Sequence, residues 1–422
     1  MALVLLTRTP VRYLFPQGGG LSNIWGRHVN AELGSTSNLG RCYSTITKAP
    51  CTSFTRVRVL LKNERATKGD VDGVLLAVTN RYTDTIDAAV PSVGNTLTGN
   101  PATGWIQATF SGNPVPTLPD YNASEGKDAG LLWSDWMTIG SIAPTDGTTY
   151  PYIMARIRIN TNNYTYSNHG NPDDANRDTK QNWMRTAWKN VDGITDPTNF
   201  ANLSGGGSST VTAIFGFEFE STQTGIRVLF CGDSITAGQG AASSNGYNSY
   251  SWAPRAIQTL RAEALPLSCL NFGYPGASTT ACDLIARKAI DFFAPQIACF
   301  SVYSSNDGAF TQSIADAEYT RALAFAAYAW ANGALPVLYF QTPSNTETGT
   351  QNNLWTVLKD RVRTQSGFAM FDMRPSVSDG AFPERFVSGT NTDNLHPNDT
   401  GYDLMATVCA NRLRAILRQN GL

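Results

Sequence analysis

The 422-residue sequence has little charge, only three histidines and no closely spaced pair of cysteines. Charged residues make up 15% of the chain and the formal net charge is -1, so we expect neither a basic surface for nucleic acid nor an acidic tail. No apolar run approaches the roughly eighteen residues of a membrane span. Arg8 and Arg12 interrupt the apolar stretch of residues 1–15, which makes it a poor signal peptide. The sequence therefore predicts no nucleic-acid partner and no membrane span.

The seven cysteines are odd in number and show no C-x-x-C spacing, which argues against a zinc site. Cys231, Cys269 and Cys299 lie in or beside apolar runs and are expected to be small buried hydrophobic side chains. Cys42 and Cys51 are the only pair placed to close a short loop by a disulfide, and the sequence leaves open whether they do so.

Other candidate metal ligands lack the necessary spacing. His28 and His169 have no ligand pattern around them, so we interpret both as structural or surface residues. Residues 171–178, NPDDANRD, carry acidic and amide oxygens without the spacing of a calcium loop, and a solvated turn is the simpler interpretation. We expect no metal and no other cofactor.

Residues 1–222 are predicted to form a β-rich domain with a sandwich or jelly-roll architecture, because short β-like runs alternate with turn residues. Two of these runs show the period-two alternation of half-buried strands. The glycine-rich segment 203–210, LSGGGSST, is interpreted as a loop inside this domain. The predicted strands are 54–61, 73–78, 105–110, 152–159 and 211–219.

Residues 223–422 are predicted to form a second domain, since apolar strands there alternate strictly with longer helical segments. Such alternation gives a parallel sheet covered by helices on both faces, with ligands at the carboxyl ends of the strands. The predicted strands are 226–231, 267–273, 297–303, 335–341 and 368–372. The predicted helices are 252–264, 279–292, 314–332, 352–365 and 400–418.

The most informative segment is RVLFCGDSITAGQG at residues 227–240. Its apolar run ends in Gly232-Asp233-Ser234, the way a buried strand delivers a serine hydroxyl to a tight turn. Asp393 precedes His396 by three residues near the other end of the chain. A serine early and an aspartate and histidine late form a workable order for a nucleophile, an orienting acid and a base. We expect Asp233 to shape its own turn rather than to react.

Four separated segments resemble, in order, the blocks of the SGNH/GDSL hydrolase family. The resemblance lies within the second domain and leaves the first unrecognised. It implies a flavodoxin-like three-layer α/β/α domain that acts as a serine esterase or deacetylase. Ser304 is a departure, because this family usually has glycine there. The four segments are GDSITAG at 232–238, NFGYPGAST at 271–279, SSND at 304–307 and DNLHPNDTGY at 393–402.

The resemblance also implies a role for each site residue. Ser234 would attack an ester carbonyl, His396 would take its proton, and Asp393 would orient the imidazole. The oxyanion would be held by the N–H groups of Ser234 and Gly276 and by the side-chain amide of Asn306. Each position also has a structural alternative as a turn or capping residue or as a surface histidine.

A β-domain joined to this class of hydrolase is common where the substrate is an acylated polysaccharide. We therefore expect removal of O-acetyl or other short acyl groups from a carbohydrate. A lipase- or thioesterase-like activity on small acyl esters, or a non-catalytic protein that binds glycans or a receptor, are the alternatives. The first domain has several tryptophans that would suit stacking on sugars or packing in its core: Trp105, Trp133, Trp136, Trp183 and Trp188.

The sequence gives less information about where the protein acts. Low lysine content and richness in Asn, Thr and Gly fit an appendage protein of a virus or prophage that trims surface glycans. The same traits fit a secreted enzyme, so an extracellular or virion-associated location is favoured. The oligomeric state is left open.

Overall fold

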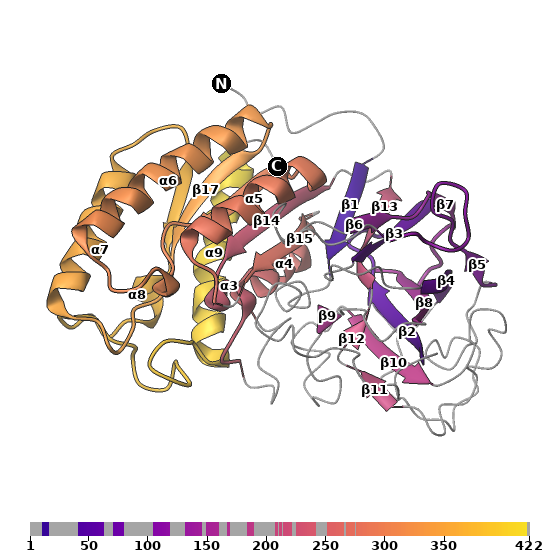
Figure 1. Ribbon diagram of the computed structural model, residues 1–422, viewed down its shortest axis with the longest axis horizontal. Coiled ribbons are helices and arrows are strands. Elements are labelled where there is room, and N and C mark those ends of the chain that lie inside the picture. The colour runs from indigo at the N-terminus through magenta and orange to yellow at the C-terminus, as the bar shows by residue number, and fades with distance from the viewer. Residues whose placement is uncertain are drawn as a thin grey trace. The chain divides into compact units, whose positions relative to one another are not determined.

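The computed structural model describes residues 11–16, 41–62, 71–79, 104–118, 131–145, 149–159, 167–168, 184–189, 207–209, 211–212, 214–221, 225–241, 251–265, 267–274 and 276–419. His28, His169, Trp183 and the segment 171–178 lie outside these residues. The chain divides into two compact units at the junction of Gly225 and Ile226 (Figure 1).

The first unit is built from antiparallel sheets. One sheet has the order β1-β13-β3-β6, with β7 also paired to β3, and the other has the order β11-β10-β2-β8-β4-β5; β9 and β12 form a separate pair. The strands are β1 (Val11–Pro16), β2 (Arg41–Lys48), β3 (Arg56–Lys62), β4 (Val71–Thr79), β5 (Ile106–Gln107), β6 (Leu131–Trp133), β7 (Met137–Thr138), β8 (Tyr152–Ile159), β9 (Ser167–Asn168), β10 (Met184–Lys189), β11 (Gly207–Ser209), β12 (Val211–Thr212) and β13 (Ile214–Ser221).

Both larger sheets contribute to one hydrophobic core. Val59 of β3 and Phe217 of β13 come from one sheet, and Val74 of β4 and Ile157 of β8 come from the other; all four are fully buried. The residues that alternate with Val57 and Val59 along β3 include two arginines, which follow the period of two that places successive side chains on opposite faces. The predicted β-rich domain is confirmed as two sheets around one core.

Three sequence predictions in this unit differ from the structure. The predicted strand 105–110 is reduced to β5, because the chain turns at Phe110 and Asn113, and the Asp135 carboxylate accepts hydrogen bonds from the N–H groups of Ser111 and Gly112. Residues 207–209 of the predicted loop form β11, paired with β10. The predicted strand 211–219 is two strands, β12 and β13, which pair with different partners.

Three tryptophans of the first unit carry an arginine over the ring. The Arg58 guanidinium lies 4.4 Å from the ring centroid of Trp133 and 4.8 Å from that of Trp136. Arg156 is buried and lies 4.2 Å from the ring centroid of Trp105, and this burial lowers the pKa of Arg156 to about 10. Cation–π packing therefore occupies part of these rings. A role of residues 1–222 in binding glycans stays a prediction.

The second unit has a five-stranded sheet of order β15-β14-β16-β17-β18, and every neighbouring pair is parallel. This is the flavodoxin-like 2-1-3-4-5 order of a doubly wound sheet, as predicted. The strands are β14 (Ile226–Gly232), β15 (Leu267–Gly273), β16 (Ile297–Ser301), β17 (Leu335–Phe340) and β18 (Ala369–Asp372). The helices are α3 (Ser234–Ala237), α4 (Trp252–Ala262), α5 (Thr279–Phe293), the 3-10 helix η4 (Ser305–Asp307), α6 (Gln312–Ala331), α7 (Gly349–Arg363), α8 (Arg374–Val377) and α9 (Asp399–Gln419).

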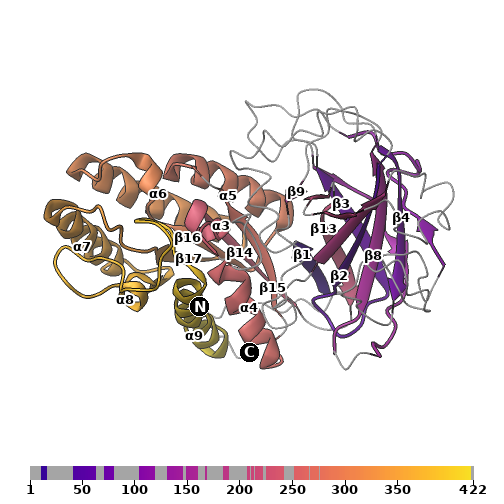
Figure 2. The same cartoon turned by 90° about the horizontal axis from the view of Figure 1, so that it is seen from below.

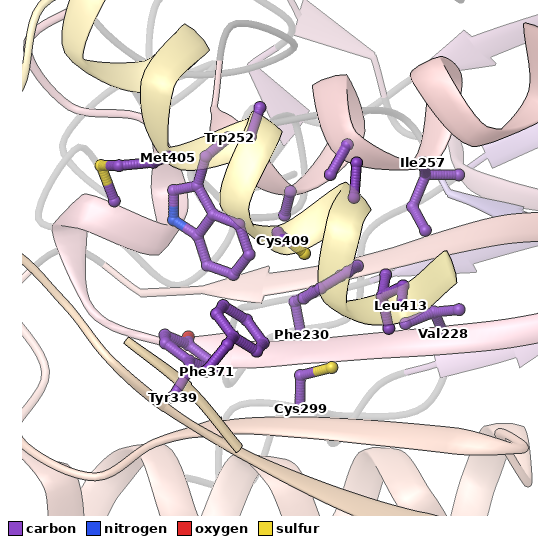
Figure 3. Close-up of a cluster of buried hydrophobic side chains, with 14 of the residues drawn as sticks. Val228, Phe230, Trp252, Ile257, Cys299, Tyr339, Phe371, Met405, Cys409 and Leu413 are labelled. Carbon is purple, nitrogen blue, oxygen red and sulfur yellow. The ribbon is translucent and has the colours of Figure 1, made fainter. Parts of the chain in front are cut away.

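Helices cover both faces of this sheet. Helices α5 and α6 pack on one face and α4 and α9 on the other (Figure 2). Trp252 at the start of α4 is fully buried and lies edge-on to Phe230, Tyr339 and Phe371 of the sheet, with Met405 of α9 close by (Figure 3). Aromatic packing of this kind holds strands β14, β17 and β18 against the helical layer that carries the C-terminal motif.

All seven cysteines lie in the described part of the chain and are buried, and none of them forms a disulfide. The interpretation of Cys231, Cys269 and Cys299 as buried hydrophobic side chains is confirmed, and Cys42 and Cys51 are not joined. Among the helices that the structure describes, none is both long enough and apolar enough to cross a bilayer.

Candidate active site

Ser234 lies where strand β14 ends and the single turn α3 begins. The preceding Asp233 caps this turn, because its Oδ1 accepts a hydrogen bond of 3.0 Å from the N–H of Ile235. A Cβ atom at Gly232 would collide with the hydroxyls of Thr236 and Tyr339, so only glycine permits the chain to pass this close to the strand β17. The local sequence thus fixes the serine at the carboxyl end of the central strand.

The structure brings Ser234 together with the two distant residues of the C-terminal motif. Ser234 Oγ lies 3.0 Å from His396 Nε2, and His396 Nδ1 lies 2.7 Å from Asp393 Oδ2. Ser234 is 4% exposed and His396 8%, whereas the Asp393 side chain is 55% exposed. A hydroxyl, an imidazole and a carboxylate in this chain of contacts have the geometry of a nucleophile, a base and an orienting acid.

The loop that carries His396 is held by the same carboxylate. Asp393 Oδ1 accepts hydrogen bonds from the N–H groups of Leu395, at 2.8 Å, and His396, at 2.6 Å. Partial burial raises the pKa of Asp393, but hydrogen bonds from the His396 ring and from these two N–H groups outweigh it and leave the pKa below its ordinary value. Asp393 is therefore ionised at neutral pH and fixes both the backbone and the ring of His396.

Gly240 permits the close approach of the segment after α3 to the histidine loop. Its φ of 95° is a left-handed conformation, and a Cβ there would meet the carbonyl of Pro397 and the Cβ of His396. Tyr402 of α9 adds a hydrogen bond of 2.6 Å from its hydroxyl to the carbonyl of Gln239. Residues 239–240 and the C-terminal motif are thus packed directly together.

Asp233, next to the serine, is fully buried and lies in a polar network that the sequence did not reveal. Ser304 Oγ lies 2.7 Å from Asp233 Oδ2 and 2.8 Å from the carbonyl of Ala277, and Gln341 Nε2 donates to Asp233 Oδ1 at 3.0 Å. Burial raises the pKa of Asp233, and these hydrogen bonds oppose the rise without cancelling it.

The Ser304 hydroxyl has one proton and faces two acceptors, Asp233 Oδ2 and the Ala277 carbonyl. Ala277 also accepts from Asn306 Nδ2, at 3.1 Å, so its carbonyl keeps a partner when the Ser304 hydroxyl donates to Asp233. Burial of Asp233 nevertheless leaves its pKa raised. We expect this carboxyl to retain a proton to a higher pH than an ordinary aspartate.

Replacing Asp233 by asparagine is expected to stabilise the fold increasingly as the pH rises. Folding raises the pKa of Asp233 above its ordinary value near 3.9. Stability is therefore lost as the pH rises from this ordinary pKa to the pKa in the folded chain, because the unfolded chain ionises first. Asparagine in Asp233→Asn keeps an amide oxygen that can accept from the N–H of Ile235, and it does not ionise. At pH 8 the Tm of the full chain should rise by about 2 °C or more, and the gain should vanish near pH 4.

The control for this prediction is Asp379→Asn, at an exposed loop carboxylate whose pKa is lowered by hydrogen bonds from the N–H groups of Arg385 and Ala381. For Asp379→Asn the pH dependence of stability has the opposite sign, because the ionised Asp379 side chain stabilises the folded state at a pH above its ordinary pKa. A Tm difference for Asp233→Asn that is the same at pH 4 and pH 8 would contradict a raised pKa.

Gly276 and Asn306 are the two further residues predicted to hold an oxyanion. Gly276 precedes Ala277, whose carbonyl contacts Ser304, and Asn306 contacts Ser304 directly. Gly276 is exposed and has a φ of 78°, which favours glycine. Asn306 is exposed, and its Nδ2 lies 3.1 Å from the Ala277 carbonyl and 3.0 Å from Ser304 Oγ. Both amide protons of Asn306 thus have acceptors inside the protein, and one of these bonds must open before the amide can serve a substrate oxygen.

A pocket of about 140 Å³ lies beside this group and is bordered by Asp233, Ile235 and Leu395, the neighbours of Ser234 and His396. Gln341 and Thr342 also line it and were not singled out from the sequence. Their signal was available, because they are polar residues directly after the apolar strand β17, at the edge where parallel sheets bind ligands. Within the part of the chain that the structure describes, no group of three or more His, Cys, Asp or Glu could hold a metal ion.

A serine, a histidine and an aspartate in contact at the edge of a flavodoxin-like sheet form an arrangement that also occurs in serine hydrolases. Residues 230–404 match the model of the GDSL-like Lipase/Acylhydrolase family. Over these residues the chain is similar to GDSL-like lipases and acylhydrolases, and the resemblance found in the sequence is confirmed.

Several solved structures are similar to part of the chain. The esterase EstA from Pseudoalteromonas sp. is 16% identical, with a TM-score of 0.36, and the match covers 46% of this chain and 98% of that one. A family 3 carbohydrate esterase from Clostridium thermocellum is 12% identical over 46% and 98% of the two chains, with a TM-score of 0.36. A lipase/acylhydrolase from Enterococcus faecalis is 17% identical over 45% and 96%, with a TM-score of 0.36. The comparison with curated proteins found no match.

Proposed function

We propose that this protein hydrolyses esters of short acyl groups, above all O-acetyl groups on a carbohydrate, through an acyl-enzyme on Ser234. The observation that carries the proposal is the continuous contact from Ser234 Oγ through the His396 ring to Asp393, at 3.0 Å and 2.7 Å. A serine hydroxyl is a weak nucleophile unless a base within hydrogen-bond reach removes its proton.

The reaction would proceed in two steps. Ser234 Oγ attacks the ester carbonyl carbon while its proton moves to His396 Nε2, and the carbonyl electron pair moves onto oxygen. Collapse of this intermediate breaks the bond to the alcohol, which leaves with the proton from His396. Water then attacks the acyl-serine with the same base, and the carboxylic acid is released. Asp393 keeps the imidazole in the tautomer with its free nitrogen toward Ser234 and stabilises the imidazolium.

The negative oxygen of the intermediate needs donors that are already aimed at it. We assign the backbone N–H groups of Ser234 and Gly276 to this role, together with the Asn306 amide after it releases Ala277 or Ser304. The exposure of Asn306 and Gly276 supports the assignment, because both can be reached by a substrate. Ser304, which bonds to the segments of all three donors, would keep their spacing.

The preference for short acyl groups is supported by the hydroxyl, amide and carboxylate groups that line part of the pocket beside Ser234. An alkyl chain of eight carbons would have to bury against hydroxyl, amide and carboxylate groups, which is unfavourable when their hydrogen bonds are not replaced.

The test is hydrolysis of p-nitrophenyl acetate, butyrate and octanoate by the full chain, followed by acetate release from acetylated xylan. We expect kcat/KM for the acetate to exceed that for the octanoate at least tenfold, with acetate released from the polysaccharide. A preference for octanoate without acetate release would replace this proposal by a lipase- or thioesterase-like activity. No hydrolysis of any ester would favour a binding protein.

A further inference from the structure

Three side chains that line the pocket beside Ser234 each carry a buried polar atom with no hydrogen-bond partner within the described chain. These atoms are Ser305 Oγ, Gln341 Oε1 and Thr342 Oγ1. Gln341 is 3% exposed and Thr342 6%, so bulk water reaches neither side chain freely. Nearly all buried polar groups in native proteins are hydrogen-bonded to protein, water or ligand. Three such atoms around one pocket indicate a ligand with several hydrogen-bonding groups.

Apolar surface is also present, because aromatic rings line another part of the pocket. Tyr303 lies 4.5 Å from Phe310 and 5.0 Å from Trp355, measured between ring centroids, and the three rings pack on one another. A sugar ring presents C–H groups on its faces and hydroxyls at its edge, so it can meet aromatic and polar walls at once. An acyl chain could use only the aromatic wall.

The charged groups in the pocket lining favour a neutral sugar over an anionic one. Two carboxyl groups line the pocket: Asp233 accepts from Gln341, and Glu347 is paired with the buried Arg374, whose Nη1 donates to Glu347 Oε1 at 3.1 Å. No lysine, arginine or histidine is among the described residues that line the pocket. Without a cation to pair with, an anionic sugar or a phosphate would be desolvated at a cost. The lining therefore fits a neutral, hydroxylated ring.

The volume of the pocket fits a single six-membered ring. A protein cavity of about 150 Å³ accepts a six-membered ring such as benzene, and this pocket measures about 140 Å³ and is open on one side. Asp233 and Leu395, which border the pocket, are the chain neighbours of Ser234 and His396. A ring held there would be the alcohol part of an ester whose carbonyl lies at the serine.

We propose that this pocket is the subsite for the neutral sugar ring that bears the acyl group, with Ser305, Gln341 and Thr342 as its hydrogen-bonding residues. The proposal rests on the ester hydrolysis proposed above and specifies where and how the alcohol part is recognised.

The experiment compares two acetate esters of equal ring size, 6-O-acetylglucose and cyclohexylmethyl acetate. The wild-type chain is expected to prefer the sugar ester in kcat/KM. Thr342→Val and Ser305→Ala each remove a hydroxyl that has no partner in the described chain, so neither breaks an internal hydrogen bond and both should fold. Each variant should lower the preference for the sugar ester about tenfold, mainly through KM, since an unmatched polar group strongly affects discrimination.

The matched control is Thr407→Val, the same change on the exposed face of α9, which should leave the preference unchanged. If the wild type cleaves both esters and neither pocket variant alters the preference, the subsite is wrong while ester hydrolysis stands. If Thr342→Val improves hydrolysis of p-nitrophenyl octanoate more than it affects the sugar ester, the pocket holds the acyl chain instead. If the wild type cleaves neither ester, the proposed function itself fails.

Discussion

Ser234→Ala is expected to lower kcat/KM for p-nitrophenyl acetate by a factor on the order of 10^4, with folding unchanged. The substitution removes the Oγ atom that lies 3.0 Å from His396 Nε2, and with it the only group proposed to form the acyl-enzyme. Ser234 is 4% exposed, and alanine fits the same space without strain. The loss should appear in kcat, because the remaining site still binds substrate.

The control is Ser313→Ala, an exposed serine in the first turn of α6, which should leave the rate unchanged. Thermal unfolding of both variants separates loss of chemistry from loss of structure. Hydrolysis by Ser234→Ala at a rate within tenfold of wild type would remove Ser234 from the mechanism.

Asp393→Asn is expected to have the second largest effect, a fall in kcat of about 10^2- to 10^3-fold. Asparagine can still accept from the N–H groups of Leu395 and His396, so the loop should keep its shape. It cannot stabilise an imidazolium, and its NH2 group facing His396 Nδ1 favours the wrong tautomer. The effect should be smaller than that of Ser234→Ala because Asp393 is 55% exposed and water partly replaces it.

Asp379→Asn is the matched control for this variant. Asp379 also accepts two backbone N–H groups in an exposed loop, but it contacts no histidine in the described structure. An unchanged kcat is expected there. Equal kcat values for Asp393→Asn and wild type would show that the carboxylate does not orient the base.

The sequence predicted the second domain closely because its elements carry their own periodicity. Strand 267–273 and the helix predicted at 252–264 lie where expected, within two residues. The single turns α3 and α8 were not predicted, since four residues are too few for a helical period. In the first domain β2 was not predicted, because its polar residues gain strand structure only by pairing with β8 and β10.

The candidate active site also has one part that local motifs predicted and another that they did not. Local motifs named Ser234, Asp393 and His396, since each motif places its residue at a strand end or in a loop. The burial of Asp233 and its contacts with Ser304 and Gln341 join segments more than 70 residues apart in the chain. Such contacts depend on tertiary packing, and no local pattern in this sequence reports them. The pocket beside the serine is an intermediate case, because Gln341 and Thr342 follow the apolar strand β17 directly but its other walls come from distant segments.

The most direct test of the account is covalent labelling with an alkyl fluorophosphonate, followed by mass spectrometry of the intact chain and of its peptides. We predict one phosphonyl group per chain, attached to Ser234, no labelling of Ser234→Ala, and loss of ester hydrolysis in proportion to labelling. Labelling at a different serine, or full hydrolysis by a chain that carries the label on Ser234, would contradict the assignment of the nucleophile.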